Sequence, residues 1–395
     1  MPANEAYIVS SVRTAVGKAP RGTLRNFRPD DMAAFAVGEA VERVKDLQPE
    51  HIDDVIMGSA FSEAQQGMVL GRVIAQKAGL PDSVPGATVN RFCSSGLQTI
   101  AMATQAIAFG QGDVIIAGGA ESMSLVPMSG HYFMPNPAIV RDDPALYISM
   151  GNTAENVAEK YHIARRDQDA FSLRSHHRAL EAIEAGHFDE ETVSLDVEDA
   201  QYVNGKTQVA STVFKVDEGP RPDTNMEALA GLRPVFRMGG TVTAGNSSQT
   251  SDGAAATTVM SKRMIEELGI EPMARLVGYA VAGVEPELMG MGPAKAVPKV
   301  LAQVGLSLDD IGLIELNEAF AAQALAVIGE LGLNEDTVNI NGGAIALGHP
   351  LGCTGAKLTA TLLHSMKRRG VRYGLCTMCV GGGMGAAGIF ENLML

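Results

Sequence analysis

The sequence predicts an α/β protein built as two similar halves, each rich in β-α-β units and packed as layers, with an inserted loop domain. The main observation is an internal repeat, which identifies duplicated architectures before any local pattern does. Three segments of the first copy match the second when 259 is added to the residue number: 52–61 with 311–320, 93–97 with 352–356, and 113–119 with 372–378. A chance match would not hold one register across three separated segments.

A break in this register locates the inserted domain. Residues 253–259 match 385–391 at an offset of only 132, so the first copy contains about 127 additional residues. The additional segment is richer in Pro, Met and charge, and we interpret it as a lid or ligand platform. The predicted divisions are 1–121 with 248–272 for the first half, 122–247 for the inserted loop domain, and 273–395 for the second half.

The insertion contains one clear amphipathic pattern, which predicts a helix over about 165–185. Ala170, Leu173, Leu180 and Ile183 are spaced to form its apolar face. Within each repeated copy, a short apolar run precedes a helical pattern, which predicts parallel strands with crossover helices. Ligands of such sheets bind at the strand ends. Equivalent positions of the two copies, Cys93 and the stretch 349–352, are therefore expected to line one cleft.

Composition narrows the class of protein. The 395 residues have a formal net charge of −14, which argues against a nucleic-acid surface. An anionic ligand could still bind at local arginines such as Arg221, Arg233 and Arg237. Four cysteines form no disulfide framework and fit a reducing compartment. With no signal-like start and no apolar run long enough to span a bilayer, we expect a cytoplasmic protein without a membrane span.

Cys93 lies where an apolar run gives way to an amphipathic one, so a strand is expected to end and a helix to begin there. A helix N-terminus stabilises a thiolate, which makes Cys93 a candidate nucleophile. The alternative is a small buried apolar side chain. His349 follows a glycine-rich stretch and is the natural base for a thiol across the cleft. A purely structural histidine is the alternative.

Cys376 and Cys379 form a closely spaced pair, but a structural zinc site needs two further ligands, and no metal site is predicted. Residues three apart on a strand point to opposite faces. Cys379, beside the glycines at 381–383, is therefore the functional candidate, and Cys376 and Cys353 are assigned to the core. The glycine loop can supply N–H groups to an oxyanion. Asn317 ends a predicted strand and either polarises a carbonyl or caps the next helix.

These stretches together resemble a known family. Four segments are similar to the signatures of the thiolases, and a fifth is similar to their coenzyme A loop: 90–96, 317–320, 341–352 and 379–385, then 240–248. The resemblance covers essentially the whole chain. It is strongest to degradative 3-ketoacyl-CoA thiolases, partly because Ser149 precedes Met150 where acetoacetyl-specific relatives often have His.

The resemblance implies CoA-dependent cleavage of 3-ketoacyl-CoA to acetyl-CoA and a shortened acyl-CoA, in fatty acid β-oxidation. It assigns nucleophilic attack to Cys93 after proton transfer to His349. The oxyanion would be held by the N–H groups of Cys93 and Gly381. Cys379 would protonate the departing enolate and then deprotonate CoA, while Asn317 would hold a water at the enolate oxygen.

The resemblance also implies ligand contacts. Coenzyme A is expected as co-substrate, with no permanently bound cofactor. Arg221 is expected near its adenine end, although Ala228 stands where some members have serine. The pantetheine arm is expected against Ser248, Phe236, Met150, Ala319 and Phe320. A homo-oligomer, dimer or dimer of dimers, is expected, and docking to a multifunctional β-oxidation partner is left open.

Three alternatives stand beside this hypothesis. A biosynthetic acetoacetyl-CoA thiolase would use the same residues. A decarboxylating ketosynthase of the same duplicated fold typically pairs its cysteine with two histidines, whereas Asn317 and Cys379 occupy those places here. A non-catalytic acyl-CoA carrier would be expected to lack one of the three reactive residues, and none is missing.

Overall fold

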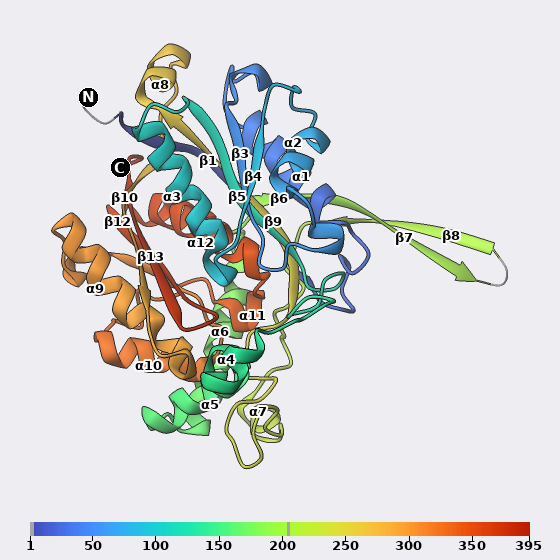
Figure 1. Cartoon of the computed structure of the whole chain (residues 1–395), viewed down its shortest axis with the longest axis vertical. Helices are drawn as coiled ribbons and strands as arrows, with labels where there is room; N and C mark the ends of the chain where they lie inside the picture. The colour runs from blue at the N-terminus through green and yellow to red at the C-terminus, as the bar shows by residue number, and fades with distance from the viewer. Residues whose placement is uncertain (1–3, 204–205) are drawn as a thin grey trace.

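The computed structural model describes residues 4–203 and 206–395, and Figure 1 shows their arrangement. The predicted domain divisions include residues 1–3 and 204–205, which lie outside the described part of the chain. The strands of the first half are β1 (Ala6–Thr14), β3 (Asp54–Gly58), β4 (Gly86–Val89), β5 (Val114–Ser122) and β9 (Ser251–Ser261). Those of the second half are β10 (Ala274–Gly283), β11 (Leu313–Leu316), β12 (Tyr373–Val380) and β13 (Met384–Asn392).

The strand order shows the duplication directly. Hydrogen-bonded neighbours run β11-β12-β13-β10-β1-β9-β5-β3-β4, and the two halves join at β1 and β10 through the pair Ile8 and Ala274. Outward from this junction, β1, β9, β5 and β3 correspond to β10, β13, β12 and β11. The prediction of a duplicated α/β fold is confirmed.

The sheet is mixed rather than parallel, which corrects one prediction. The pairs β3–β4, β3–β5 and β11–β12 are parallel, whereas β1–β9, β5–β9, β10–β13 and β12–β13 are antiparallel. The short turn 381–383 between β12 and β13 explains the difference, because so short a connection joins only antiparallel strands. In the first half, the inserted segment replaces this turn between β5 and β9.

Helices cover the sheet in layers. The outer face of the first half is covered by α1 (Pro29–Glu42) and α2 (Leu70–Lys77), and that of the second by α9 (Gly292–Val304) and α10 (Ala321–Leu331). Between the halves, α3 (Ser95–Ala108) packs on α12 (Leu351–Arg369). Apolar side chains of this helix pair share one core with strands of both halves. The N-terminal ends of α3 and α12 therefore lie close together, between the two halves.

The insertion forms a separate group of elements beside the layers. It contains α4 (Pro137–Asp142), α5 (Met150–Lys160), α6 (Arg165–Glu184), β7 (Leu195–Val203), β8 (Lys206–Phe214) and α7 (Met226–Ala230). The β7–β8 hairpin extends away from the body (Figure 1). Short elements complete the chain: β2 (Gly17–Lys18), β6 (Thr192–Val193), α8 (Lys262–Leu268) and α11 (Ala344–Leu347). None of the helices within the described ranges has both the length and the apolar character needed to cross a membrane.

The helix predicted at 165–185 is present as α6, but its predicted buried face is wrong. Ala170 is exposed, and Leu173, Leu180 and Ile183 are only partly buried. The buried face instead contains polar side chains such as Gln168 and Ser175. Their partners explain the difference. Ser175 donates to Glu318 at 2.6 Å and Gln168 donates to Thr241 at 3.0 Å, while Ala179 and Ala182 pack on Ala346 and Leu347, so this face of α6 meets loops and the short helix α11 rather than a sheet.

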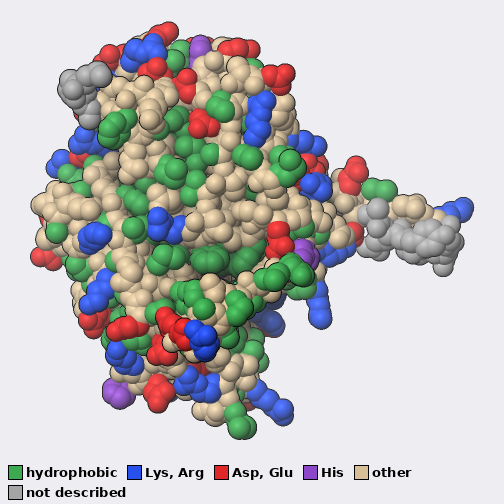
Figure 2. All heavy atoms as spheres, viewed as in Figure 1, with side chains coloured by type: hydrophobic (Ala, Val, Ile, Leu, Met, Phe, Trp, Pro, Cys, Tyr) green, Lys and Arg blue, Asp and Glu red, His purple; other side chains and the backbone are tan. Residues whose placement is uncertain are grey.

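The chain has a net negative charge, but the face shown in Figure 2 has no large patch of one charge. Acidic and basic side chains are interspersed on it. Among the described residues, no group of three or more His, Cys, Asp or Glu side chains is placed to hold a metal ion. All four cysteines are free and buried.

Candidate active site

Cys93, His349 and Cys379 line one cavity of about 290 Å³. Each is placed by a different element. Cys93 lies in the turn Phe92–Ser94 that leads into α3, His349 lies two residues before α12, and Cys379 lies at the end of β12. The central helix pair and the duplicated sheet thus bring together three residues that are far apart in the sequence. The expected cleft between Cys93 and the stretch 349–352 is present.

The turn that carries Cys93 is strained and held in place. Phe92 has φ of 40°, a conformation that side chains other than glycine rarely adopt. Its N–H donates to Asn90 Oδ1 at 2.8 Å, and its carbonyl accepts from Ser95 Oγ at 2.7 Å. The side chain of Cys93 is 1% exposed. These two hydrogen bonds therefore hold the turn that places the Cys93 thiol at the cavity.

The protonation state of Cys93 differs from the sequence-based expectation. Burial raises the pKa of the Cys93 thiol to about 12, and the hydrogen bond from the Gly381 N–H opposes this rise without cancelling it. The expected preference for a thiolate at a helix N-terminus is wrong for this closed cavity, because desolvation of the charged sulfur exceeds the effect of the dipole. Cys93 rests as a neutral thiol and needs a base.

Iodoacetamide is expected to alkylate Cys93 slowly at pH 7, with a rate that keeps rising as the pH increases. Only the thiolate reacts, and the raised pKa of Cys93 keeps its fraction small until strongly alkaline pH. Peptide mass spectrometry of quenched samples measures the rate. Unfolded protein is the control, since its cysteines should reach their plateau near the ordinary pKa of about 8.5. A plateau below pH 8 in the folded protein would contradict the prediction.

The hydrogen bonds of His349 define its tautomer. Nδ1 lies 2.6 Å from Thr354 Oγ1, and that hydroxyl donates to the Pro350 carbonyl at 2.9 Å. The Thr354 oxygen therefore accepts, so Nδ1 carries the proton. Nε2 lies 3.3 Å from Asn317 Nδ2 and accepts from it. Burial lowers the pKa of His349 to about 3, so the imidazole is neutral and its unprotonated Nε2 can accept a proton.

Asn317 contacts His349 and does not cap a helix. The following helix α10 begins at Ala321 with no side-chain cap, so the capping alternative is not observed. Besides its contact with His349, Asn317 has a buried Oδ1 without a hydrogen-bond partner among the described residues. Buried polar atoms are normally paired. This oxygen is therefore available as an acceptor for a water or a substrate group.

Cys379 and Cys376 do not share a site, as predicted. Cys379 is fully buried in a small cluster with Met289, Ala319 and Phe320 at the cavity, whereas Cys376 lies in the central core. Burial, and then the neighbouring Cys93, raise the pKa of Cys379. It therefore rests as a thiol, the form that can donate a proton. Cys353 also lies in the central core.

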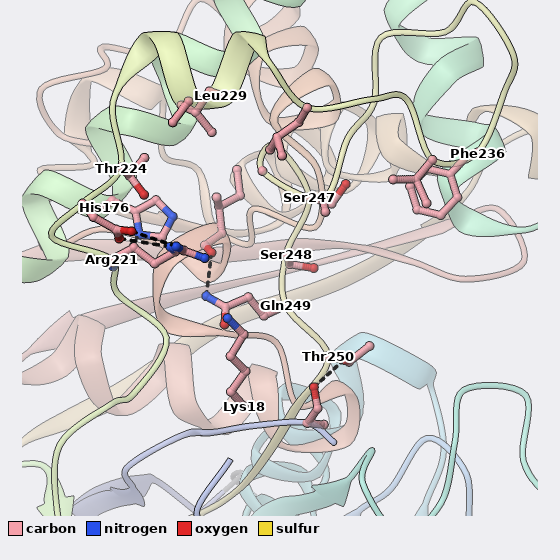
Figure 3. Close-up of a pocket in the computed structure, with 18 residues that line it drawn as sticks. Lys18, His176, Arg221, Thr224, Leu229, Phe236, Ser247, Ser248, Gln249 and Thr250 are labelled. Atoms are coloured by element: carbon pink, nitrogen blue, oxygen red, sulfur yellow. Dashed lines mark hydrogen bonds and ion pairs between the residues drawn. The ribbon is translucent and has the colours of Figure 1, made fainter. Parts of the chain in front are cut away.

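A second cavity of about 490 Å³ adjoins the first. Phe236 and the segment 247–250 line both cavities. Figure 3 shows His176 and Arg221 on one side of this outer cavity, segment 247–250 in the middle and Phe236 on the other side. The Phe236 and Phe320 rings meet edge to face at 6.0 Å. The two cavities together form a path from the surface to Cys93.

The ligand-binding residues predicted from the sequence divide between these cavities. Met150, Ala319 and Phe320 line the inner cavity, Ser248 and Phe236 line both, and Arg221 lines the outer cavity. Arg221 forms an ion pair with Asp223 at 2.9 Å. Arg233 and Arg237 line neither cavity, and Arg237 pairs with Glu159 at 3.1 Å. Anion binding by Arg233 and Arg237 stays a prediction.

Sequence reasoning missed two residues of the outer cavity and one of the inner site. Lys18 and His176 line the outer cavity, where His176 accepts from the Arg221 N–H at 3.1 Å. Thr354 sets the tautomer of His349. Ala228 also lines the outer cavity. Of the three missed residues, only Thr354 could have been suspected from the sequence, because it lies five residues after His349 at the start of a helix.

Comparison with known proteins gives matches over nearly the whole chain. The family model described as thiolase, N-terminal domain, matches residues 6–263, and the model described as thiolase, C-terminal domain, matches residues 270–392. A 3-ketoacyl-CoA thiolase of Bacillus subtilis is 54% identical over 98% of this chain and 99% of its own length.

Solved structures are similar over the same extent. The Bacillus anthracis acetyl-CoA acetyltransferase superposes with a TM-score of 0.91 at 42% identity, covering 99% of this chain and 100% of its own. Human mitochondrial 3-ketoacyl-CoA thiolase gives a TM-score of 0.88 at 37% identity, with the same coverage of each chain.

Proposed function

Because this chain belongs to the thiolase family and is an acyltransferase, we propose that it catalyses the CoA-dependent cleavage of 3-ketoacyl-CoA to acetyl-CoA and a shortened acyl-CoA. The observation that carries the proposal is that Cys93, His349 and Cys379 line one buried cavity. The adjoining cavity, open to the surface, gives the long pantetheine arm of coenzyme A a path to the thiol.

The first half-reaction begins with transfer of the Cys93 proton to His349 Nε2. The sulfur then attacks the 3-keto carbon, and the N–H groups of Cys93 and Gly381 stabilise the oxyanion. Collapse of the tetrahedral adduct breaks the bond between C2 and C3. The departing acetyl-CoA enolate takes a proton from the Cys379 thiol, with its oxygen near His349 and a water on Asn317, and the acyl group stays on Cys93.

The second half-reaction restores the enzyme. The Cys379 thiolate takes the proton of the CoA thiol, and the CoA sulfur attacks the acyl group on Cys93. The bond between the acyl carbon and Cys93 breaks, and the proton held by His349 returns to the sulfur of Cys93. The resting pKa shifts support this order, because both thiols start protonated and the imidazole starts neutral.

Replacing Thr354 by valine is expected to lower kcat about tenfold with little change in KM, because losing one buried hydrogen bond of this kind costs on the order of 1–3 kcal/mol. The variant leaves His349 Nδ1 without an acceptor, so the tautomer with a free Nε2 loses its preference. Thr354→Ser keeps the hydroxyl and is the matched control. Equal kcat values for the valine and serine variants would contradict the assigned tautomer.

Steady-state thiolysis over a series of 3-ketoacyl-CoA chain lengths, beginning with acetoacetyl-CoA and CoA, tests the function. Formation of acetyl-CoA is the expected result. A non-catalytic carrier would bind these ligands without product, and a ketosynthase would instead decarboxylate a malonyl thioester. Comparison with the reverse condensation of acetyl-CoA distinguishes a degradative enzyme from a biosynthetic acetoacetyl-CoA thiolase.

We assign the degradative role in fatty acid β-oxidation, supported by Ser149 before Met150 and by the 3-ketoacyl-CoA thiolase names of relatives. The B. anthracis structure, named an acetyltransferase, supports the biosynthetic alternative.

A cytoplasmic location is proposed from the four free cysteines. A dimer or dimer of dimers is proposed from the family resemblance, and sedimentation analysis tests it. Copurification with hydratase and dehydrogenase activities would identify a multifunctional partner.

A further inference from the structure

We propose that Glu121 is a positioning residue that fixes Cys93 and His349 relative to one another, and that it does so as a carboxylate. The inference rests on the function proposed above. Glu121 lies at the end of β5 and is fully buried. It accepts four hydrogen bonds, from the N–H groups of Ala60, Phe61 and Gly352 and from Gln66 Nε2.

One set of contacts leads from Glu121 to Cys93. Oε2 accepts from the Ala60 N–H at 2.7 Å. The Ala60 carbonyl accepts from Asn90 Nδ2 at 2.9 Å, and Asn90 Oδ1 accepts from the Phe92 N–H at 2.8 Å. This is the hydrogen bond that holds the strained turn at Phe92. The position of the nucleophile therefore depends on Glu121 through two intermediate residues.

The other set of contacts leads from Glu121 to His349. The same atom, Oε2, accepts from the Gly352 N–H at 2.7 Å. Gly352 is the second residue of α12, and His349 lies three residues before it. A Cβ at Gly352 would meet Glu121 Oε2 at 2.7 Å and Ser59 Cα at 2.6 Å, so only glycine allows this approach. One carboxylate oxygen thus holds the segments that carry the nucleophile and the base.

The partners of Glu121 show that it is ionised. All four are donors, so a protonated carboxyl would have no acceptor for its own hydrogen. The Gln66 amide cannot rotate to provide one, because its Nε2 also donates to the Phe61 carbonyl and its Oε1 accepts from the Ser122 N–H. Burial raises the pKa of Glu121 above its ordinary value, and the hydrogen bonds from the four donors oppose this rise without cancelling it, so the ionised state is assigned from the four donors rather than from the pKa. None of the ion pairs among the described residues includes Glu121.

The fold does not require this carboxylate. In the repeat, the position 259 residues after Glu121 is Val380, which ends the corresponding strand β12. The second half therefore builds the same strand end with an apolar side chain. The carboxylate is therefore not needed to end this strand, and in the first copy it accepts the N–H groups of Ala60 and Gly352.

Replacement of Glu121 by glutamine tests the proposal. The amide has the same size, but its NH₂ group must face N–H donors and its charge is lost. We expect kcat for thiolysis to fall tenfold to a hundredfold, with KM values for acetoacetyl-CoA and CoA within twofold of wild type. We also expect the pH profile of Cys93 alkylation to move to lower pH, because the negative charge of Glu121 contributes to the raised pKa of Cys93.

Glu155→Gln is the matched control, since Glu155 is also buried and accepts the N–H groups of Thr241 and Val242 in the loop that precedes segment 247–250. We expect this variant to raise KM for CoA and to leave the alkylation profile unchanged. An E121Q enzyme with wild-type kcat and an unmoved alkylation profile would overturn the inference. Absence of thiolysis in the wild type would instead overturn the proposed function, and the alkylation profile would still test the effect of the Glu121 charge on the pKa of Cys93.

If the glutamine variant fails to fold, Glu121→Asp decides the question. Aspartate keeps the charge but is one methylene shorter, so it cannot reach both Ala60 and Gly352 at hydrogen-bond distance. We expect kcat to fall at least tenfold while the alkylation profile stays near that of the wild type. Wild-type kcat in the aspartate variant would contradict a positioning role.

Discussion

Replacing Cys93 by serine is expected to lower kcat for the cleavage of acetoacetyl-CoA by at least about 10⁴-fold, leaving turnover close to the background. A serine hydroxyl is far less acidic than a thiol, and the only base at hand is an imidazole whose pKa burial lowers to about 3. Such a base can accept a proton only as the nucleophile attacks. The poorer nucleophile therefore loses most of the rate.

Steady-state thiolysis measures this loss, and mass spectrometry of the quenched enzyme checks its cause. The wild type should carry an acyl group on the peptide containing Cys93, and the serine variant should carry none. Cys376→Ala is the control, because Cys376 is equally buried but lies in the central core. That variant should retain activity with a modest loss of stability. Unchanged turnover in Cys93→Ser would end the assignment of the nucleophile.

Replacing Cys379 by serine is expected to lower kcat by about 10³-fold, within the range that a general acid or base contributes. Both half-reactions depend on this thiol, which first protonates the enolate and then deprotonates CoA. Serine fills the same space but exchanges its proton poorly in either direction. The residue lies in the small cluster beside Met289 and Phe320, so the substitution leaves the central core intact.

Rapid quenching followed by mass spectrometry separates the two roles of Cys379. Cleavage of acetoacetyl-CoA reports its role as an acid, and transfer of a preformed acyl group from Cys93 to CoA reports its role as a base. We expect both steps to slow and acylated Cys93 to persist when CoA is added. Normal acyl transfer to CoA in the variant would show that another group deprotonates the CoA thiol.

The sequence predicted those parts of the site that occupy equivalent positions in the two repeated copies. The constant offset placed Cys93 against the stretch around His349, and the pleat of a strand separated Cys379 from Cys376. The first prediction depends on the repeat, and the second depends on the geometry of a single strand. The same reasoning placed the strands in each half but missed the antiparallel pairs. The pairing of β5 with β9 spans the whole insertion, whereas the short connection between β12 and β13 was a local signal of a hairpin that the helical periodicity outweighed.

Other features depend on contacts between distant segments and could not be found from the sequence. The buried face of α6 includes Gln168 and Ser175 because it meets Thr241 and Glu318, and apolar spacing alone pointed to the wrong side. The pKa of Cys93 reflects burial, which no short stretch reveals. Glu121 follows a run of glycine and alanine that looks like an ordinary strand, and its partners lie on three other segments of the chain.

The reactive thiol stands just before the first turn of α3, where Ser95, Gly96 and Leu97 are buried and the helix packs on α12 between the two half-sheets. Amides in so enclosed a turn exchange with solvent only when the whole domain opens, because local fraying cannot reach them. Heating would therefore remove catalysis and secondary structure together, in one cooperative transition, and the molecule would have no partly melted form that still turns over substrate.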